Sequence, residues 1–249
     1  MLDVNMGVPG VDQKPLMKEV IETLSMLVET PFSIDSTDPA VVEAGLRSFP
    51  GRALINSVSD KPGVKEQIFA LAKKYGAVVL VLPLEEKGLP KTAEERLTIV
   101  KRLVTDGKAA GLSDRDFMLD PLVLTAASDG QAPQETLRTL QGYRKEFGYP
   151  TTMGLSNVSF GLPGREDINT AFYLMALASG LDAPIINPCS EKIKTMTAAS
   201  RVIRGTDSQG IEYSKNYVEK NIATSSTPAV TSGDVLAELC QAVMTGEKE

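Results

Sequence analysis

The chain has 249 residues, of which 42% are apolar and 23% charged, a composition typical of a folded globular protein. Its 26 basic and 32 acidic residues leave a net charge of −6, which argues against non-specific nucleic-acid binding, because such binding depends on Lys and Arg neutralising phosphates. The sequence shows no apolar run of about 18 residues and no signal-peptide pattern. We therefore expect a cytoplasmic protein without a membrane-spanning helix.

The histidine and cysteine counts limit the catalytic and metal-binding chemistry that the chain can perform. The sequence contains no histidine, which excludes Ser-His and Cys-His nucleophile pairs and histidine-bound zinc. It contains only two cysteines, Cys189 and Cys240, which are too few for a disulfide scaffold or a cysteine metal cluster. The chemistry must therefore come from carboxylates, amides, hydroxyls, the backbone or a borrowed cofactor.

Apolar runs of strand length alternate with amphipathic stretches along the chain. The runs are continuously apolar, as is typical of parallel strands buried on both faces. In chain order we predict strands at residues 2–5, 32–36, 53–57, 78–84, 117–123, 151–157 and 184–187. We predict helices at residues 16–29, 40–47, 96–106, 168–178 and 191–203. Asp38-Pro39 is expected to begin the second of these helices, and a capping box from Thr92 to Glu95 the third.

The alternation of strands and helices predicts an α/β fold with a parallel sheet. An open doubly wound sheet and a barrel both fit this pattern, but polar residues at the carboxyl ends of nearly all strands favour a barrel, whose active site lies there. The first predicted strand has no element before it, so we expect a (β/α)8 TIM barrel that lacks its first βα unit in this chain. We assign residues 1–220 to this barrel and residues 221–249 to a linker and a C-terminal helix, the helix at 235–244.

Asp and Asn residues gather at the carboxyl ends of the predicted strands. Both residue types are unfavourable in strands, so their presence indicates helix capping or ligand binding. Capping explains Asp38, whereas Asp35 and Asn56 follow their apolar runs too early to cap a helix. Carboxylates and amides suit a heterocycle with an amino-amide edge, because they pair with its N–H donors and its carbonyl. A divalent metal is the competing interpretation, which the excess of Asn disfavours, and we expect no metal site. The polar residues at the strand ends are Asp3, Asn5, Asp35, Ser36, Asn56, Ser57, Asp120, Ser156, Asn157 and Asn187.

Five segments carry a resemblance to a known family. They are Leu-Asp-Val-Asn-Met-Gly from residue 2, Ile-Asp-Ser-Thr from 34, Leu-Ile-Asn-Ser from 54, Leu-Asp-Pro-Leu from 119 and Gly-Leu-Ser-Asn-Val-Ser-Phe-Gly-Leu-Pro from 154. In them the chain resembles the pterin-binding family, and within it the methyltetrahydrofolate:corrinoid methyltransferases and the folate-binding domain of cobalamin-dependent methionine synthase. The resemblance runs from residue 2 to about residue 204, and the last segment is its most specific part.

The resemblance implies a pterin at the carboxyl rim of a (β/α)8 barrel. The residues that match the pterin site are Asp35, Asn56 and Asp120 at the ring edge, Asn5 beside them, Gly154 and Ser156 in the pocket wall, and Asn157 near N5 of the pterin, where it is the expected catalytic residue.

The activity implied by the resemblance is methyl transfer between N5 of tetrahydrofolate and the cobalt of a corrinoid (cobalamin). The chain has no Asp-x-His-x-x-Gly segment, so we expect a partner protein to carry the corrinoid. A homodimer is implied by the resemblance alone, and the direction of transfer stays open. Two alternatives are a dihydropteroate synthase-like pterin enzyme, in which we would expect a basic residue set for the pyrophosphate leaving group, and a non-catalytic folate-binding fragment of a multidomain methionine synthase.

Overall fold

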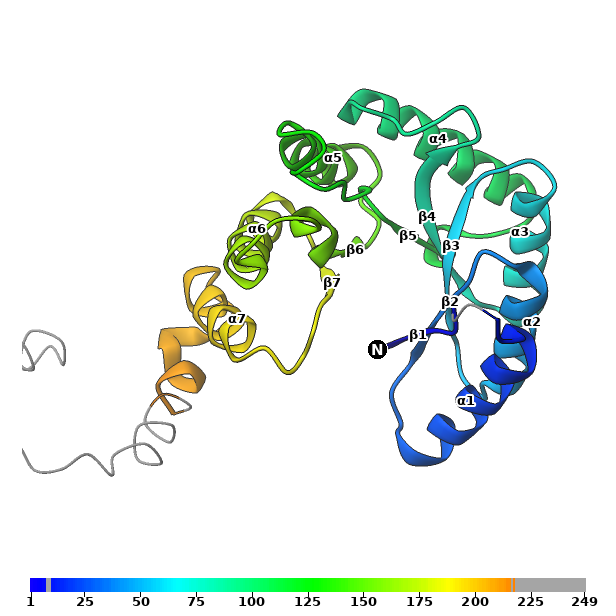
Figure 1. Cartoon of the computed structure of the whole chain (residues 1–249), viewed down its shortest axis with the longest axis horizontal. Coiled ribbons are helices and arrows are strands. Elements are labelled where there is room, and N and C mark those ends of the chain that lie inside the picture. Colours follow the sequence, from blue (N-terminus) through cyan, green and yellow to red (C-terminus); the bar gives the residue numbers. More distant parts are fainter. Residues whose placement is uncertain (8–9, 216, 218–249) are drawn as a thin grey trace, which may run out of the picture. The chain divides into compact units, whose positions relative to one another are not determined.

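The computed structural model describes residues 1–7, 10–215 and 217 (Figure 1). The chain divides into two units, Met1–Met196 and a second unit that begins at Thr197. The first unit holds every strand of the described residues. The predicted linker at 221–234 and the predicted helix at 235–244 lie outside the described residues, as does the predicted domain boundary after residue 220. Within the described part of the chain, no helix has the length and apolar character needed to cross a membrane.

Strands and helices alternate as the sequence predicts, and the α/β fold is confirmed. The strands are β1 Leu2–Asn5, β2 Phe32–Asp35, β3 Leu54–Asp60, β4 Val78–Glu85, β5 Phe117–Leu119, β6 Thr152–Gly154 and β7 Ala183–Ile185. The helices are α1 Gln13–Leu27, α2 Pro39–Ser48, α3 Val64–Tyr75, α4 Ala93–Ala109, α5 Ala132–Glu146, α6 Arg165–Ser179 and α7 Glu191–Ile203. All seven predicted strands and all five predicted helices are present, and α3 and α5 were not among the predictions.

All strand pairs are parallel, and the pairing follows chain order. One sheet has the order β1-β2-β3-β4-β5 and the other pairs β6 with β7. A single parallel bridge between Leu119 and Thr151 joins β5 to the start of β6. Figure 1 shows α1 to α4 on the outer side of the five-stranded sheet. This is the arrangement of a TIM barrel wall, and in the described residues β1 and β7 each lack a second strand neighbour.

The strands separate an outer and an inner apolar layer. The outer layer lies between the strands and the helices and contains Ile34, Ile55 and Val79. The inner layer contains Leu54, Leu80 and Met118, against which Ala183 of β7 packs. Since successive strand residues point to opposite faces, Asp35 and Asn56 lie on the same face as the inner layer. Full burial of each such Leu or Ile stabilises the fold by about 1.5–3 kcal/mol.

The predicted helix starts are confirmed. Asp38 is the N-cap of α2, and its Oδ1 accepts a hydrogen bond from Ala40 N at 2.8 Å, with Pro39 in the first turn. Thr92 and Glu95 form the predicted capping box of α4, in which Glu95 N donates to Thr92 Oγ1 at 3.2 Å and Thr92 N to Glu95 Oε2 at 3.2 Å.

Two predicted strands extend three or more residues too far. The fifth was predicted to reach residue 123, but β5 ends at Leu119 because the chain turns at Asp120 and Pro121 has no N–H for a strand ladder. The sixth was predicted to reach residue 157, but β6 ends at Gly154 and Leu155–Ser159 forms a 3-10 helix. Ser and Asn side chains compete for backbone hydrogen bonds and favour such turns. Both errors fall on the segments that carry predicted site residues.

Candidate functional site

Three predicted site residues lie in one row across neighbouring strands. The parallel register pairs Asn5 of β1 with Asp35 of β2, and Asp35 with Asn56 of β3. Paired residues of adjacent strands project to the same face, which here is the face of the inner apolar layer. The row therefore presents amide, carboxylate and amide groups side by side at the carboxyl end of the sheet.

Side-chain hydrogen bonds connect this row in pairs. Asn5 Nδ2 donates to Asp35 Oδ2 at 2.7 Å, while Asn5 Oδ1 accepts from Gly7 N at 2.7 Å. Asn56 Nδ2 donates to Asp3 Oδ1 at 3.2 Å. Asp3 was among the polar strand-end residues, but sequence reasoning gave it no role. The signal that could have found it is its position two residues before Asn5, which places both on the same face of β1.

The environment of Asp35 makes its charged form less stable than it would be in water. Partial burial raises the pKa of the Asp35 carboxyl, the hydrogen bond from Asn5 acts in the opposite direction, and the negative charge of Asp3 raises it further. A ligand that brings N–H donors to this carboxylate would compensate for the lost water contacts. The row can thus accept hydrogen bonds through Asp35 and both donate and accept them through the two amides.

Asp120 lies in the turn that follows β5. It lies two residues after Met118 and is therefore expected to project to the same face, that of the inner apolar layer. Its side chain is 9% exposed, and its Oδ1 accepts a hydrogen bond from Leu122 N at 2.7 Å. Burial raises the pKa of Asp120 to about 7, against the opposing effects of the Leu122 N–H and the positive charge of Arg96. Asp120 is therefore a buried carboxyl that changes charge near neutral pH.

The 3-10 helix Leu155–Ser159 carries the other predicted site residues. Gly154 precedes it, and a Cβ atom on Gly154 would lie 3.2 Å from Asn157 Nδ2, so glycine leaves room for the Asn157 amide. The side chains of Ser156 and Asn157 are both exposed. Asn157 is thus available to a ligand at the rim, while its backbone carbonyl accepts a hydrogen bond from Phe160 N at 3.2 Å.

Arg165 ties this 3-10 helix to α6. Its Nη2 donates to Ser156 O at 2.9 Å and its Nε to Ser159 Oγ at 3.0 Å. A cavity of about 480 Å³ lies beside this contact, and its lining includes Ser156, Arg165, Asn169, Ile185 and Asn187. Asn169 Oδ1 is buried without a hydrogen-bond partner in the described structure. The cavity therefore combines a cation and amides with apolar walls.

The predicted site residues fall into two groups. Asn5, Asp35 and Asn56 form the strand row, whereas Asp120, Ser156 and Asn157 lie on turns after β5 and β6. Sequence reasoning missed the residues that support the turn after Asp120, chiefly Arg96 and Tyr143, because a charged or polar residue in a helix gives no signal that it is buried.

Comparison with known proteins identifies the family. Residues 1–187 match the family described as "Pterin binding enzyme". The chain is 32% identical over 200 residues to methionine synthase of Mycobacterium tuberculosis, and this match covers 75% of the chain and 17% of that protein. It is 26% identical over 224 residues to the methylcorrinoid:tetrahydrofolate methyltransferase of Eubacterium limosum, covering 89% of the chain and 83% of that protein. The chain therefore spans about a sixth of the length of the methionine synthase it matches.

Solved structures support the same fold. Dihydropteroate synthase of Yersinia pestis, solved with a pterin–sulfa conjugate, superposes with a TM-score of 0.63 at 18% identity and 82% coverage of both chains. Dihydropteroate synthase of Clostridium difficile, solved in the presence of pteroic acid, gives a TM-score of 0.61 at 20% identity, with 80% of this chain and 78% of the other covered. At these identities the likeness concerns the fold alone. From its match over residues 1–187, the chain belongs to the pterin-binding enzyme family.

Proposed function

We propose that this chain is a methyltransferase that moves a methyl group between N5 of tetrahydrofolate and the cobalt of a corrinoid carried by a partner protein. The observation that carries the proposal is the match over most of the chain to both a methylcorrinoid:tetrahydrofolate methyltransferase and a methionine synthase. The Eubacterium limosum protein matches over most of its own length, which supports a corrinoid on a separate protein. We keep the cytoplasm and a homodimer as expectations.

The strand row and Asp120 are the proposed pterin site. A reduced pterin presents ring N–H and amino donors beside a carbonyl acceptor. Asp35 and Asp120 can accept from the donors, and the amides of Asn5 and Asn56 can serve the ring nitrogens or the carbonyl. The burial of Asp120 and the partial burial of Asp35 make each such hydrogen bond stronger than it would be in water. The cavity beside Ser156 is the proposed position of the part of the folate that extends from the ring.

Asn157 is the proposed catalytic residue. The corrinoid, when its partner protein delivers it, supplies the cobalt centre that exchanges the methyl group. N5 needs hydrogen-bond stabilisation as the bond to its methyl group breaks or forms, and the chain has no histidine to supply it. The exposed amide of Asn157, on a turn held by Arg165, can orient a hydrogen bond to N5 that strengthens in the transition state. The chain has no histidine, so it offers no imidazole to the cobalt.

Calorimetry with tetrahydrofolate and 5-methyltetrahydrofolate tests the proposed site. We expect micromolar binding by the wild type and a loss of roughly 10- to 100-fold in Asp35→Ala, because a charged acceptor is removed. Asp38→Asn is the matched control, since Asp38 only caps α2 and Asn caps equally well. Equal affinities of Asp35→Ala and the wild type would contradict the assignment of the strand row.

Turnover separates the proposed enzyme from its alternatives. We expect the wild type to convert cob(I)alamin and 5-methyltetrahydrofolate to methylcobalamin and tetrahydrofolate. The reaction is monitored by the change in absorbance of the cobalamin. Binding of both folates without turnover, also with a corrinoid protein, would favour a non-catalytic folate-binding module. Condensation of a pterin pyrophosphate with para-aminobenzoate would instead favour a dihydropteroate synthase-like enzyme.

A further inference from the structure

Arg96 of α4 is a fully buried charged residue next to the turn that carries Asp120. Its side chain has no exposed surface. Its Nη1 donates to Pro121 O at 3.0 Å and to Leu122 O at 3.0 Å, and it lies 3.2 Å from Thr136 Oγ1 of α5. The guanidinium therefore binds the two backbone carbonyls that directly follow Asp120.

The same turn is held by two further buried side chains. Tyr143 of α5 donates its hydroxyl to Asp120 O at 3.0 Å, and Thr136 Oγ1 donates to Leu122 O at 3.0 Å. Leu122 has a φ of 62°, a left-handed conformation that is costly for a residue with a Cβ. Within the same turn, Leu122 N donates a hydrogen bond to Asp120 Oδ1 at 2.7 Å. All three carbonyls of residues 120–122 are thus fixed from α4 and α5, and the Asp120 carboxylate with them.

Arg96 is poorly suited to stabilising the fold. Its Nε and Nη2 are buried and have no hydrogen-bond partner in the described structure. A buried cation without complete partners costs free energy, and an apolar side chain of similar volume is often as stable or more so. Replacement by Met would leave Pro121 O without a donor, whereas Leu122 O would still lie 3.0 Å from the Thr136 hydroxyl, which also lies 3.1 Å from Ala132 O. The loss of a donor to Pro121 O and the removal of a buried cation have opposite effects on stability. Stability alone therefore does not explain Arg96, and a role in shaping the rim does.

We propose that Arg96 is a positioning residue for the pterin-binding carboxylate: it holds the turn at Pro121 and Leu122 so that the Asp120 side chain faces the pterin. Tyr143 does the same at the carbonyl of Asp120 itself. The inference rests on the proposed pterin site and adds the residues that orient its most buried carboxylate.

The charges around Arg96 and Asp120 determine how the pKa of Asp120 should respond to substitution. Arg96 and Tyr143 face Asp120 from α4 and α5, and Glu95 and Glu135 act on Arg96. Burial raises the pKa of Asp120 to about 7, and the positive charge of Arg96 lowers it. Removal of the Arg96 charge should therefore raise the pKa of Asp120 further, whether or not a folate is bound.

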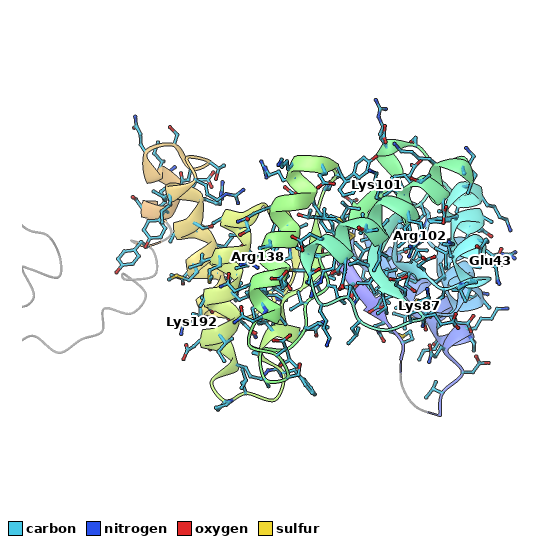
Figure 2. All side chains as sticks on the ribbon, turned by 90° about the horizontal axis from the view of Figure 1, so that it is seen from above. Glu43, Lys87, Lys101, Arg102, Arg138 and Lys192 are labelled. Carbon is cyan, nitrogen blue, oxygen red and sulfur yellow. The ribbon has the colours of Figure 1, made fainter. Side chains whose placement is uncertain are left out.

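The experiment compares Arg96→Met, Arg96→Lys and Tyr143→Phe with the wild type. Affinity for tetrahydrofolate is measured by calorimetry, and the Asp120 carboxyl is titrated by NMR in the unliganded protein. Arg102→Met is the matched control, because Arg102 (labelled in Figure 2) lies on the same helix but is exposed, and it pairs with Asp60 and Glu85 rather than with the turn at Asp120. We expect Arg96→Met to bind between about 10- and 100-fold more weakly with a raised Asp120 pKa. Arg96→Lys should keep the Asp120 pKa near that of the wild type but still bind more weakly, because the Lys ammonium lies one bond short of the Nη1 position that reaches both carbonyls.

The outcomes separate this inference from the proposed function. If the wild type binds tetrahydrofolate and Arg96→Met has the same affinity and the same Asp120 titration, the positioning role is overturned and the pterin site is left intact. A folded wild type that binds no tetrahydrofolate would overturn the proposed function, and the Asp120 titration alone would then decide the role of Arg96. If Arg96→Met does not fold, Tyr143→Phe decides, because it removes one donor to Asp120 O and no charge. Weaker binding by Tyr143→Phe would support the positioning of the turn, and unchanged binding would contradict it.

Discussion

The rim of the barrel is built in two different ways. Asn5, Asp35 and Asn56 lie on β1, β2 and β3, and the register of the strands brings them side by side. Asp120 and Asn157 lie on turns after β5 and β6, where no strand ladder fixes the backbone. Those turns are held by side chains of the surrounding helices, Arg96 and Tyr143 at the first and Arg165 at the second.

The difference has a consequence for mutation. On the strand row, the backbone ladder persists when a side chain is removed, so each substitution should affect its own contacts. On the turns, side chains of the helices hold the backbone in place, so a substitution far from the ligand should affect binding or catalysis. The helices behind β5 and β6 are therefore as much a part of the site as the rim residues.

The largest expected effect is at Asn157. Asn157→Ala should lower the methyl-transfer rate by roughly 10²–10³-fold, because a preorganised donor or acceptor at N5 is lost in the transition state. Folate affinity should change much less, as the ring edge is held by the other residues. Stopped-flow measurement of methylcobalamin formation, with calorimetry on the same samples, separates the two effects. A transfer rate equal to that of the wild type would remove Asn157 from the mechanism.

Asp120 should make both folate binding and stability depend on pH. Its carboxylate must be ionised to accept from pterin donors, so affinity should fall by up to about tenfold per pH unit below about pH 7. The folded-state pKa is raised above the unfolded value, so its contribution to the free energy of unfolding is largest below about pH 4 and is lost as pH rises through about 7.

The measurement for Asp120 is calorimetry and urea unfolding across this pH range, for the wild type and Asp120→Asn. The difference in unfolding free energy between the two proteins should change by at most about 1.4 kcal/mol per pH unit. A difference that stays constant with pH would show that Asp120 titrates normally and is not buried as described.

The smallest expected effect is at Asp3, which supports the strand row through Asn56. Asp3→Ala removes the acceptor of Asn56 Nδ2, but the pairing of Asp35 with Asn56 holds the backbone in place. Because Asp3 is exposed, tetrahydrofolate affinity should weaken by only roughly 2- to 5-fold. An effect as large as that of Arg96→Met would show that the strand row also depends on side-chain support.

Much of the fold followed from local patterns. Continuous apolar runs located all seven strands, and the Asp38-Pro39 and Thr92–Glu95 signals marked two helix starts, because strand burial and helix capping depend on neighbouring residues. Helices α3 and α5 were not among the predictions. The ends of β5 and β6 were placed too late, because the polar turn residues there follow apolar runs without a break in composition.

The amino-acid sequence by itself determined the order of the elements, the family and the identity of the polar residues at the strand ends. The tertiary structure decided which of them pair, since the bonds of Asn5 with Asp35 and of Asp3 with Asn56 join residues 30 and 53 positions apart. It also decided that Arg96, a charged helix residue that local patterns place at the surface, is buried behind Asp120. Burial and long-range pairing depend on how separate segments pack together, and the periodicity within one segment contains no information about that packing.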